Sequence, residues 1–316
     1  MIRTVKPRNA RSKRALDDRG AKLIENQKKT LLLSGTSTSE LTRHALGDLH
    51  ALKKPHAIKF TKKNDIHPFE DASAFEFFSS KNDTAHIVFA SHSKKRPHNI
   101  TFARTFDHKI LDMLELGIDE TTFRPLESFK NPKFAVGMKP MICFTGSLFD
   151  STPEYKLVKS VFLDFFRGET INAVDVEGLQ YMINVSAAEP SDRETTPVVH
   201  LRVHLIKTRK SGQKLPRVEV EEIGPRMDFR VRRIQEADAG MMKEALKKPR
   251  QLEARTKKNI ETDIIGDKLG RIHTGKQDLN KMQSRKMKGL KRGPTDDEEM
   301  TLVDAEDDKV KKARLS

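Results

Sequence analysis

The sequence contains little cysteine, few aromatic residues and no long apolar run, and each shortage excludes a class of protein. A single cysteine, Cys143, excludes a disulfide framework and a thiolate metal site, and its apolar neighbours predict a small core residue. Tryptophan is absent and aromatic residues make up 6% of the chain, which disfavours a platform for stacking single-stranded bases. No segment approaches the roughly 18 apolar residues of a membrane span, and the N-terminus is too basic for a signal peptide. We therefore expect an intracellular protein without a membrane segment.

Positive charge is abundant, and it is concentrated outside the middle of the chain. The 316 residues carry a formal net charge of +15. Residues 1–30 contribute +7 and residues 241–292 contribute +10, whereas residues 31–240 contribute only +2. This distribution predicts a folded, nearly neutral core whose basic extensions contact a polyanion such as RNA. The alternative is that the basic tails only keep the protein soluble.

The first part of this core has the pattern of a strand and a helix followed by a hairpin. Residues 31–33 predict a short buried strand, and residues 37–40 have the pattern of a capping box that begins a helix with one apolar face. Two further strands are expected at residues 86–90 and 99–103. Residues 110–116 then predict a helix, which the glycine at the next position ends.

The second part repeats this opening 111 residues later, as measured between the glycines that follow the two strands. Residues 141–144 predict a buried strand, and residues 151–154 begin a helix that ends at Gly168. Residues 199–205 alternate apolar with basic side chains, which predicts a strand with one wet, basic face. A helix is expected within residues 235–248. The repeated opening indicates a weak internal duplication.

Apolar and charged side chains alternate on both sides of Gly224-Pro225, over residues 218–232. A period of two predicts strands. Glycine permits a positive φ and proline removes a ladder donor, so this pair is interpreted as a turn between two strands. Glu219 and Glu221 would then face the arginines that follow the turn. A plain hairpin held by such ion pairs is the alternative that requires no family.

The residues Ile223, Gly224, Pro225 and Arg226 resemble the closing signature of the Brix domain. Two halves that open alike, followed by this signature, match that family, whose halves are each similar to the anticodon-binding domains of some aminoacyl-tRNA synthetases. The resemblance implies an α/β fold class, a Brix domain of two similar α/β halves. The expected segments are a disordered basic arm (1–27), the Brix domain (28–236, with halves near 28–135 and 136–236), a basic C-terminal extension (237–292) and a charged disordered tail (293–316).

Further segments narrow the resemblance to one branch of the family; they are residues 51–60, 64–70, 270–273, 277–279 and 285–291. This branch implies a nucleolar and nuclear scaffold of large-subunit assembly that is not an enzyme and needs no cofactor. It implies an obligate heterodimer with the regulator of ribosome synthesis. The pair would bring the 5S rRNA, with its two ribosomal proteins, to the pre-60S particle and support pre-rRNA maturation. Met227 departs from the family pattern, which often has an aromatic residue there, but methionine fills the same apolar slot.

We expect RNA contacts from four groups of basic residues. They follow the first helix, crown the first hairpin, lie on the wet strand face and populate the C-terminal extension. Because aromatic residues are few, binding should depend on duplex shape and backbone phosphates. The expected RNA-binding residues are Lys53, Lys54, Lys59, Lys62, Lys63, Lys94, Lys95, Arg96, Arg202, Arg271, His273, Lys276, Arg285, Lys286, Lys288 and Lys291.

Two other patterns in the sequence have simpler explanations than a functional site. Residues 270–276 have the spacing of a phosphate-binding P-loop, but Gln277 replaces the hydroxyl residue that binds magnesium, and no buried strand is expected before it. His200 and His204 share one strand face, yet Arg202 between them opposes a metal ion, so no metal site is expected. A nucleotide-hydrolysing RNA enzyme and an RNA-binding module without an obligate partner are the remaining alternatives.

Overall fold

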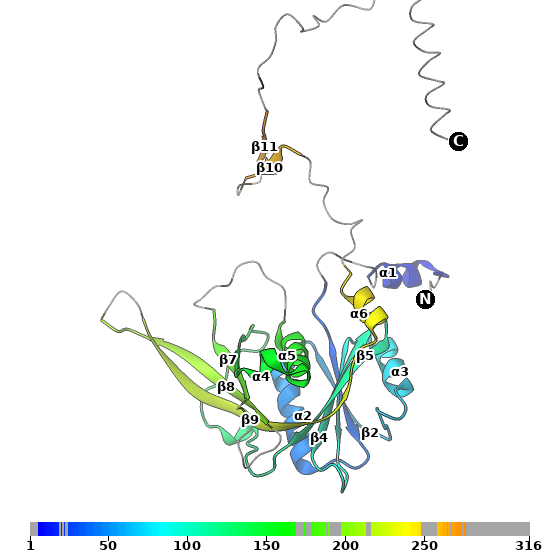
Figure 1. Ribbon diagram of the computed structural model, residues 1–316, viewed down its shortest axis with the longest axis vertical. Helices are drawn as coiled ribbons and strands as arrows, with labels where there is room; N and C mark the ends of the chain where they lie inside the picture. The colour runs from blue at the N-terminus through cyan, green and yellow to red at the C-terminus, as the bar shows by residue number, and fades with distance from the viewer. Residues whose placement is uncertain are drawn as a thin grey trace, which may run out of the picture. The chain divides into compact units, whose positions relative to one another are not determined.

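The computed structural model describes residues 6–18, 25–168, 178–187, 197–212, 216–247, 258–263 and 267–272, and the single positions 20, 22, 174, 189, 265 and 275. Residues 1–253 and 254–316 form two compact units. The first unit contains a nine-stranded sheet (Figure 1). The second contains an antiparallel pair of short strands, β10 (Ile260–Thr262) and β11 (Lys268–Gly270). None of the described helices has both the length and the apolar character needed to cross a membrane.

The strands of the large sheet follow one another in the order β2-β1-β3-β4-β5-β9-β8-β7-β6. The first half contributes β1 (Thr30–Gly35), α2 (Glu40–Lys53), β2 (Ala57–Asn64), α3 (Ser73–Asn82), β3 (His86–Ser91), β4 (Asn99–Phe106) and β5 (Lys109–Ile118). The second half contributes β6 (Met141–Thr145), α4 (Leu148–Ser151), α5 (Pro153–Phe166), β7 (Tyr181–Ala187), β8 (Val198–Arg209) and β9 (Arg217–Gln235). A 3-10 turn, η1 (Leu126–Ser128), lies between the halves, and helices α1 (Ala10–Asp18) and α6 (Ala239–Ala245) lie outside them.

The two halves pair their strands in the same way. β1 is parallel to β3, and the antiparallel pairs β3–β4 and β4–β5 follow. β6 is likewise parallel to β7, and the antiparallel pairs β7–β8 and β8–β9 follow. The halves meet where β5 and β9 pair antiparallel at the centre of the sheet. The predicted α/β fold of two similar halves is confirmed.

Apolar side chains fill both faces of the first half of the sheet, but in different clusters. The larger cluster places Leu32 and Val88 with helices α2 and α5 on one face. Their sequence neighbours Leu31 and Ile87 point to the other face, where they pack with Phe75 of α3. We call the first face the inner face and the second the outer face. No described helix covers the outer face of the second half.

Several predicted elements are present with shifted bounds. The strands expected at residues 31–33, 86–90, 99–103, 141–144 and 199–205 are β1, β3, β4, β6 and β8. Helix α2 begins after Ser39, whose side chain accepts a hydrogen bond from the amide of Thr42. The predicted capping box at residues 37–40 is therefore wrong, because Ser37 donates instead to the carbonyl of His92. Helix α1 was not predicted.

The helix predicted at residues 110–116 is wrong, because this segment is strand β5. Its residues Leu114 and Leu116 belong to the inner-face cluster, whereas Met113 belongs to the outer-face cluster. Asp112 and Glu115 interrupt the apolar residues three positions apart, which imitates the polar face of a helix. Both carboxylates are in fact buried in the strand, where Asp112 pairs with Arg104 and Glu115 pairs with Arg233.

The turn predicted at Gly224-Pro225 is also wrong, because β9 continues through it as one strand. Arg202 of β8 lies opposite Arg226, and His204 lies opposite Glu222, so residues 223–225 form a bulge opposite a single residue. Gly224 has the positive φ (71°) that the prediction required. A bulge uses this conformation without reversing the chain.

The ion pairs predicted across that turn are different in the structure. Glu219 pairs with Arg209 and Arg217, and Glu221 pairs with Lys207. Lys207 and Arg209 lie on β8, and Arg217 lies on β9 itself. The pairs form in this way because β9 pairs with β8 instead of folding back on itself. Arg230 pairs with Asp119, and Arg232 donates to Asn99, both in the first half.

Cys143 does not lie in the core. Strand β6 is a terminal strand of the sheet. Cys143 is partly exposed there, and Met141 is 47% exposed. An apolar run therefore predicted the strand correctly but not its position at an edge.

Candidate nucleic-acid interface and the seam between the halves

The tip of the β3–β4 hairpin presents cations to solvent. Lys94 and Lys95 are exposed, and Arg96 is half-buried. The turn is closed by two backbone hydrogen bonds of 3.1 Å between Ser93 and Arg96, and the Ser93 hydroxyl also accepts from the Arg96 amide. This geometry holds the two lysines at the apex, where an extended phosphate chain can reach them.

A second group of cations follows helix α2 and continues along strand β2. Lys54, Lys59, Lys62 and Lys63 are all exposed. β2 is the other terminal strand of the sheet, so these lysines line an edge. They are compatible with phosphate or with carboxylate ligands.

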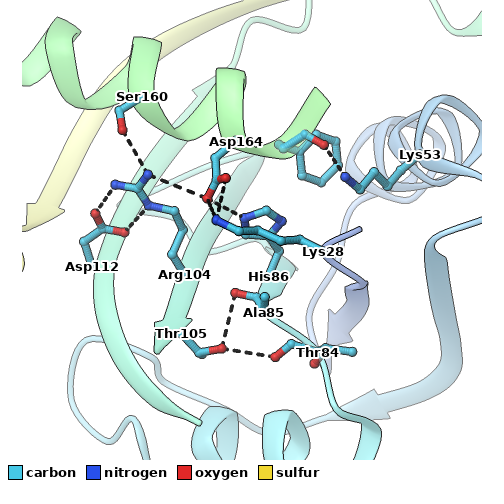
Figure 2. A network of polar contacts seen from close by, with 11 residues as sticks. Lys28, Lys53, Thr84, Ala85, His86, Arg104, Thr105, Asp112, Ser160 and Asp164 are labelled. Atoms are coloured by element: carbon cyan, nitrogen blue, oxygen red, sulfur yellow. Dashed lines mark hydrogen bonds and ion pairs between the residues drawn. The ribbon is translucent and has the colours of Figure 1, made fainter. Parts of the chain in front are cut away.

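Lys53 belongs to neither group, and its expected RNA contact is contradicted by its burial. Its ammonium lies inside the protein, where it donates to the carbonyl of Phe165 and sits 5.4 Å from the centre of that ring (Figure 2). Burial lowers the pKa of Lys53 from 10.5 to about 8. Lys53 lies on the side of α2 that faces the protein interior. The neighbouring lysines in the sequence give no sign of this burial.

Arg202 lies on the outer face of the second half, where its guanidinium is already paired with an acidic side chain. Its guanidinium pairs with Asp228 at 2.6 Å and donates to the carbonyls of Leu201 and Met227. His200 also contacts Asp228, at 2.7 Å. Burial would raise the pKa of Asp228, but the hydrogen bonds from His200 and Arg202 lower it overall. On the face that was predicted to be basic, His200 and Arg202 are thus both paired with the carboxylate of Asp228.

The same face offers no metal site in the part of the chain that the structure describes. No group of three His, Cys, Asp or Glu side chains there is arranged to hold an ion. His204 has a lowered pKa, mainly because of burial.

The signature residues join β9 to the segment that links the halves. A side chain at position 224 would collide with the ring of Phe129. Lys133 donates to the carbonyl of Ile223 at 2.8 Å, and the backbones of Arg226 and Arg124 exchange two hydrogen bonds. Arg226 also pairs with Glu222 across the bulge. Glycine is required here because the linking segment packs directly against the strand.

A largely buried polar network forms the seam between the halves, and sequence reasoning missed it. Asp164 of α5 contacts Lys28 at 2.6 Å, His86 at 3.0 Å and Arg104 at 3.9 Å (Figure 2). Arg104 in turn pairs with the fully buried Asp112. The only sequence signal was a set of charged residues placed within otherwise apolar strands and on an apolar helix.

Ionisation in this network follows from burial and pairing. Burial would raise the pKa of Asp164, but His86 and Lys28 hold it well below its usual value. The pKa of His86 is lowered, mainly because the ring is buried. A neutral His86 that donates from Nε2 to the Asp164 carboxylate satisfies both shifts.

The C-terminal extension is described only in part. Arg271 is exposed and lies 3.5 Å from Glu261 across the β10–β11 pair. The strand before the P-loop-like segment, β11, is exposed throughout. His273, Lys276, Arg285, Lys286, Lys288 and Lys291 lie outside the described residues.

A family model for the Brix domain matches residues 35–233, from the end of β1 to near the end of β9. The chain belongs to the Brix domain family. The chain is also similar to proteins named ribosome production factor 2 homolog, and this similarity includes segments outside the Brix domain. The Schizosaccharomyces pombe protein is 52% identical over 99% of both chains, and the Homo sapiens protein is 42% identical over 85% of both. The Saccharomyces cerevisiae protein, named ribosome biogenesis protein RPF2, is 54% identical over 92% of this chain and 86% of its own. Within the Brix family, the chain therefore groups with ribosome production factor 2.

Proposed function

We propose that the chain is a non-catalytic assembly factor of the large ribosomal subunit. The observation that supports this most strongly is the 52% identity to a ribosome production factor 2 homolog over 99% of both chains. The similarity includes the basic extensions as well as the Brix domain, so it covers the segments with the highest positive charge. The proposed site of action is the nucleolus, within the nucleus.

In this proposal the chain binds rRNA through the cations of the hairpin tip and of the C-terminal extension. The hairpin tip with Lys94, Lys95 and Arg96 and the C-terminal extension supply charge, while the nearly neutral Brix domain supplies a rigid frame. The extension includes Arg271, His273, Lys276 and the basic run from Arg285 to Lys291.

The proposed protein partner is the regulator of ribosome synthesis, in an obligate heterodimer. Together the two proteins would recruit the 5S rRNA and its two ribosomal proteins to the pre-60S particle. Among the described residues no further strand pairs with either end of the large sheet, and open edges favour pairing with another chain. The outer face of the second half, which no described helix covers, offers a further docking area.

The RNA part is tested by the salt dependence of binding to a 5S rRNA transcript. Deleting residues 241–292 removes sixteen basic and six acidic residues. We expect the slope of log affinity against log salt to become clearly shallower, because fewer counterions are released on binding. Deletion of the mixed-charge tail 293–316 is the matched control and should leave the slope unchanged. Equal slopes in all three proteins would refute the proposal for the extension.

The partner part is tested by co-purification of the tagged chain under native conditions. The regulator of ribosome synthesis should elute with it in a one-to-one ratio, together with 5S rRNA and its two proteins. A tagged chain that sediments with pre-60S particles but without that partner would contradict the obligate pair and leave the assembly role intact.

A further inference from the structure

The two open edges of the large sheet differ in the side chains beside them. Among the described residues, β2 pairs only with β1, so the backbone groups on its outer side are available to another strand. Ile58 lies opposite Leu31 and therefore points to the outer face, whereas Lys59 lies opposite Leu32 and points to the inner face. Lys63, opposite Ser34, lies on the same side as Lys59.

Exposed apolar side chains lie on the outer-face side of this edge. Ile58 is 39% exposed and Phe77 of α3 is 57% exposed. Phe77 continues a row of rings, with centre-to-centre distances of 5.7 Å to Phe78 and 5.9 Å from Phe78 to Phe60. The exposed Phe77 and Ile58 extend the packed row of rings toward solvent, and contiguous exposed apolar side chains are the kind of surface that partners bind.

A shallow hollow lies at the end of β2, lined by Ile66, Ala74, Phe77 and Phe78. Asp65 also lines it, and its carboxylate is 77% exposed. Asp71 nearby is exposed as well. The lysines along the strand attract negative charge. At the hollow these carboxylates repel it, and the ammonium of Lys81, 5.6 Å from the centre of the Phe77 ring, offsets part of that repulsion. A continuous phosphate backbone would meet both, whereas a peptide can match each position separately.

We propose that the β2 edge binds an extended segment of a partner protein as an additional strand. Alternate residues of that segment face opposite sides of the sheet. Acidic side chains would lie beside Lys59 and Lys63, and a large apolar side chain would enter the hollow beside Phe77. The occupant is therefore a segment in which acidic and apolar residues alternate. This goes beyond the proposed function, because it assigns these lysines to a protein ligand instead of rRNA.

The test begins with a library of random decapeptides displayed on phage. The library is selected on the full-length chain and counter-selected on its Phe77→Ser variant, which changes an exposed side chain. We expect the enriched peptides to alternate Asp or Glu with Val, Ile, Phe or Tyr. Failure to enrich any peptide, or enrichment without this alternation, would overturn the proposal.

An enriched peptide is then labelled and titrated against matched variants by fluorescence anisotropy. Phe77→Ser and the double variant Lys59→Glu/Lys63→Glu should each weaken binding about tenfold or more, corresponding to about 1.4 kcal/mol. The double variant Lys94→Glu/Lys95→Glu makes the same charge change at the hairpin tip and should bind the peptide normally. Amide exchange within residues 57–64 should slow when the peptide is bound, because a paired edge protects its amides.

The same proteins are titrated with the 5S rRNA transcript. The tip variant should bind the RNA more weakly, and Phe77→Ser should bind it normally. If the edge variants weaken RNA binding and leave the peptide unaffected, the edge is an RNA surface and the proposal fails. That result would leave the proposed assembly role standing, because the salt dependence of the C-terminal extension tests it independently.

Discussion

The two halves of the Brix domain share one strand order, yet only the first is covered on both faces. In the first half, β2 and α3 are inserted between β1 and β3, and α3 buries the outer face. In the second half, β6 is followed by α4 and α5 and then by β7, and the outer face remains uncovered among the described residues.

This difference is visible in the burial of successive residues. Residues of β3 are buried almost without interruption, whereas residues of β7 alternate between buried and half-buried. Cross-strand neighbours on the open face are polar, including Asn184, Arg202 and Arg226 in one row. The same architecture therefore accepts two sequence patterns, and coverage of the outer face decides which one is needed.

The largest expected effect comes from truncating one outer-face side chain in β3 and one in β7. Phe89→Ala removes a fully buried ring, and we expect the free energy of unfolding to fall by about 4 kcal/mol. Met182→Ala removes a half-buried side chain and should cost about 1 kcal/mol or less. Urea unfolding followed by circular dichroism measures both. Equal losses would break the comparison, because they would mean that the outer face of β7 is as buried as that of β3.

Sequence patterns predicted the second half better than the first for the same physical reason. The alternation in residues 199–205 identified β8, since one of its faces is wet. Residues of β5 suggested a helix, because Asp112 and Glu115 interrupt its apolar residues at helical spacing although both carboxylates are buried. The local rule at Gly224-Pro225 was correct about conformation and wrong about topology, because a bulge and a turn both use a positive φ.

In the candidate sites too, the sequence predicted exposure only where local structure decides it. Exposure of Lys94 and Lys95 followed from their place in a predicted turn, whereas burial of Lys53 depends on a helix from the other half that packs 112 residues away in sequence. The network around Asp164 is likewise made of contacts between residues far apart in the chain. A single sequence carries no periodic signal for such contacts.

The next effect concerns the seam that joins the halves. Asp164→Ala leaves Lys28, His86 and Arg104 without their shared carboxylate, and we expect a loss of about 3 kcal/mol at neutral pH. The folded pKa of Asp164 lies below its usual 3.8, so its stabilisation is present above that pH and is lost as the pH falls below it. The difference between variant and parent should therefore shrink in acid. Asp150→Ala removes an exposed carboxylate whose pKa Lys159 also lowers, and as the control it should change stability and its pH dependence much less than Asp164→Ala.

The smallest expected effect is that of Lys53→Met, which tests whether the ammonium of Lys53 contributes to the seam in addition to the Asp164 network. Methionine removes the cost of burying an ammonium but also removes the hydrogen bond to Phe165, so at neutral pH the two changes should cancel within about 1 kcal/mol. The folded pKa of about 8 lies below the usual 10.5, so between these values the unfolded chain binds more protons than the folded chain. Lys53 therefore makes the parent more stable as the pH rises through this window, and the variant should lack that rise. Lys54→Met, at the adjacent exposed position, should retain the rise in urea unfolding at neutral and alkaline pH. If both variants keep the parental pH dependence, Lys53 is solvated, and the seam between the halves consists of the Asp164 network alone.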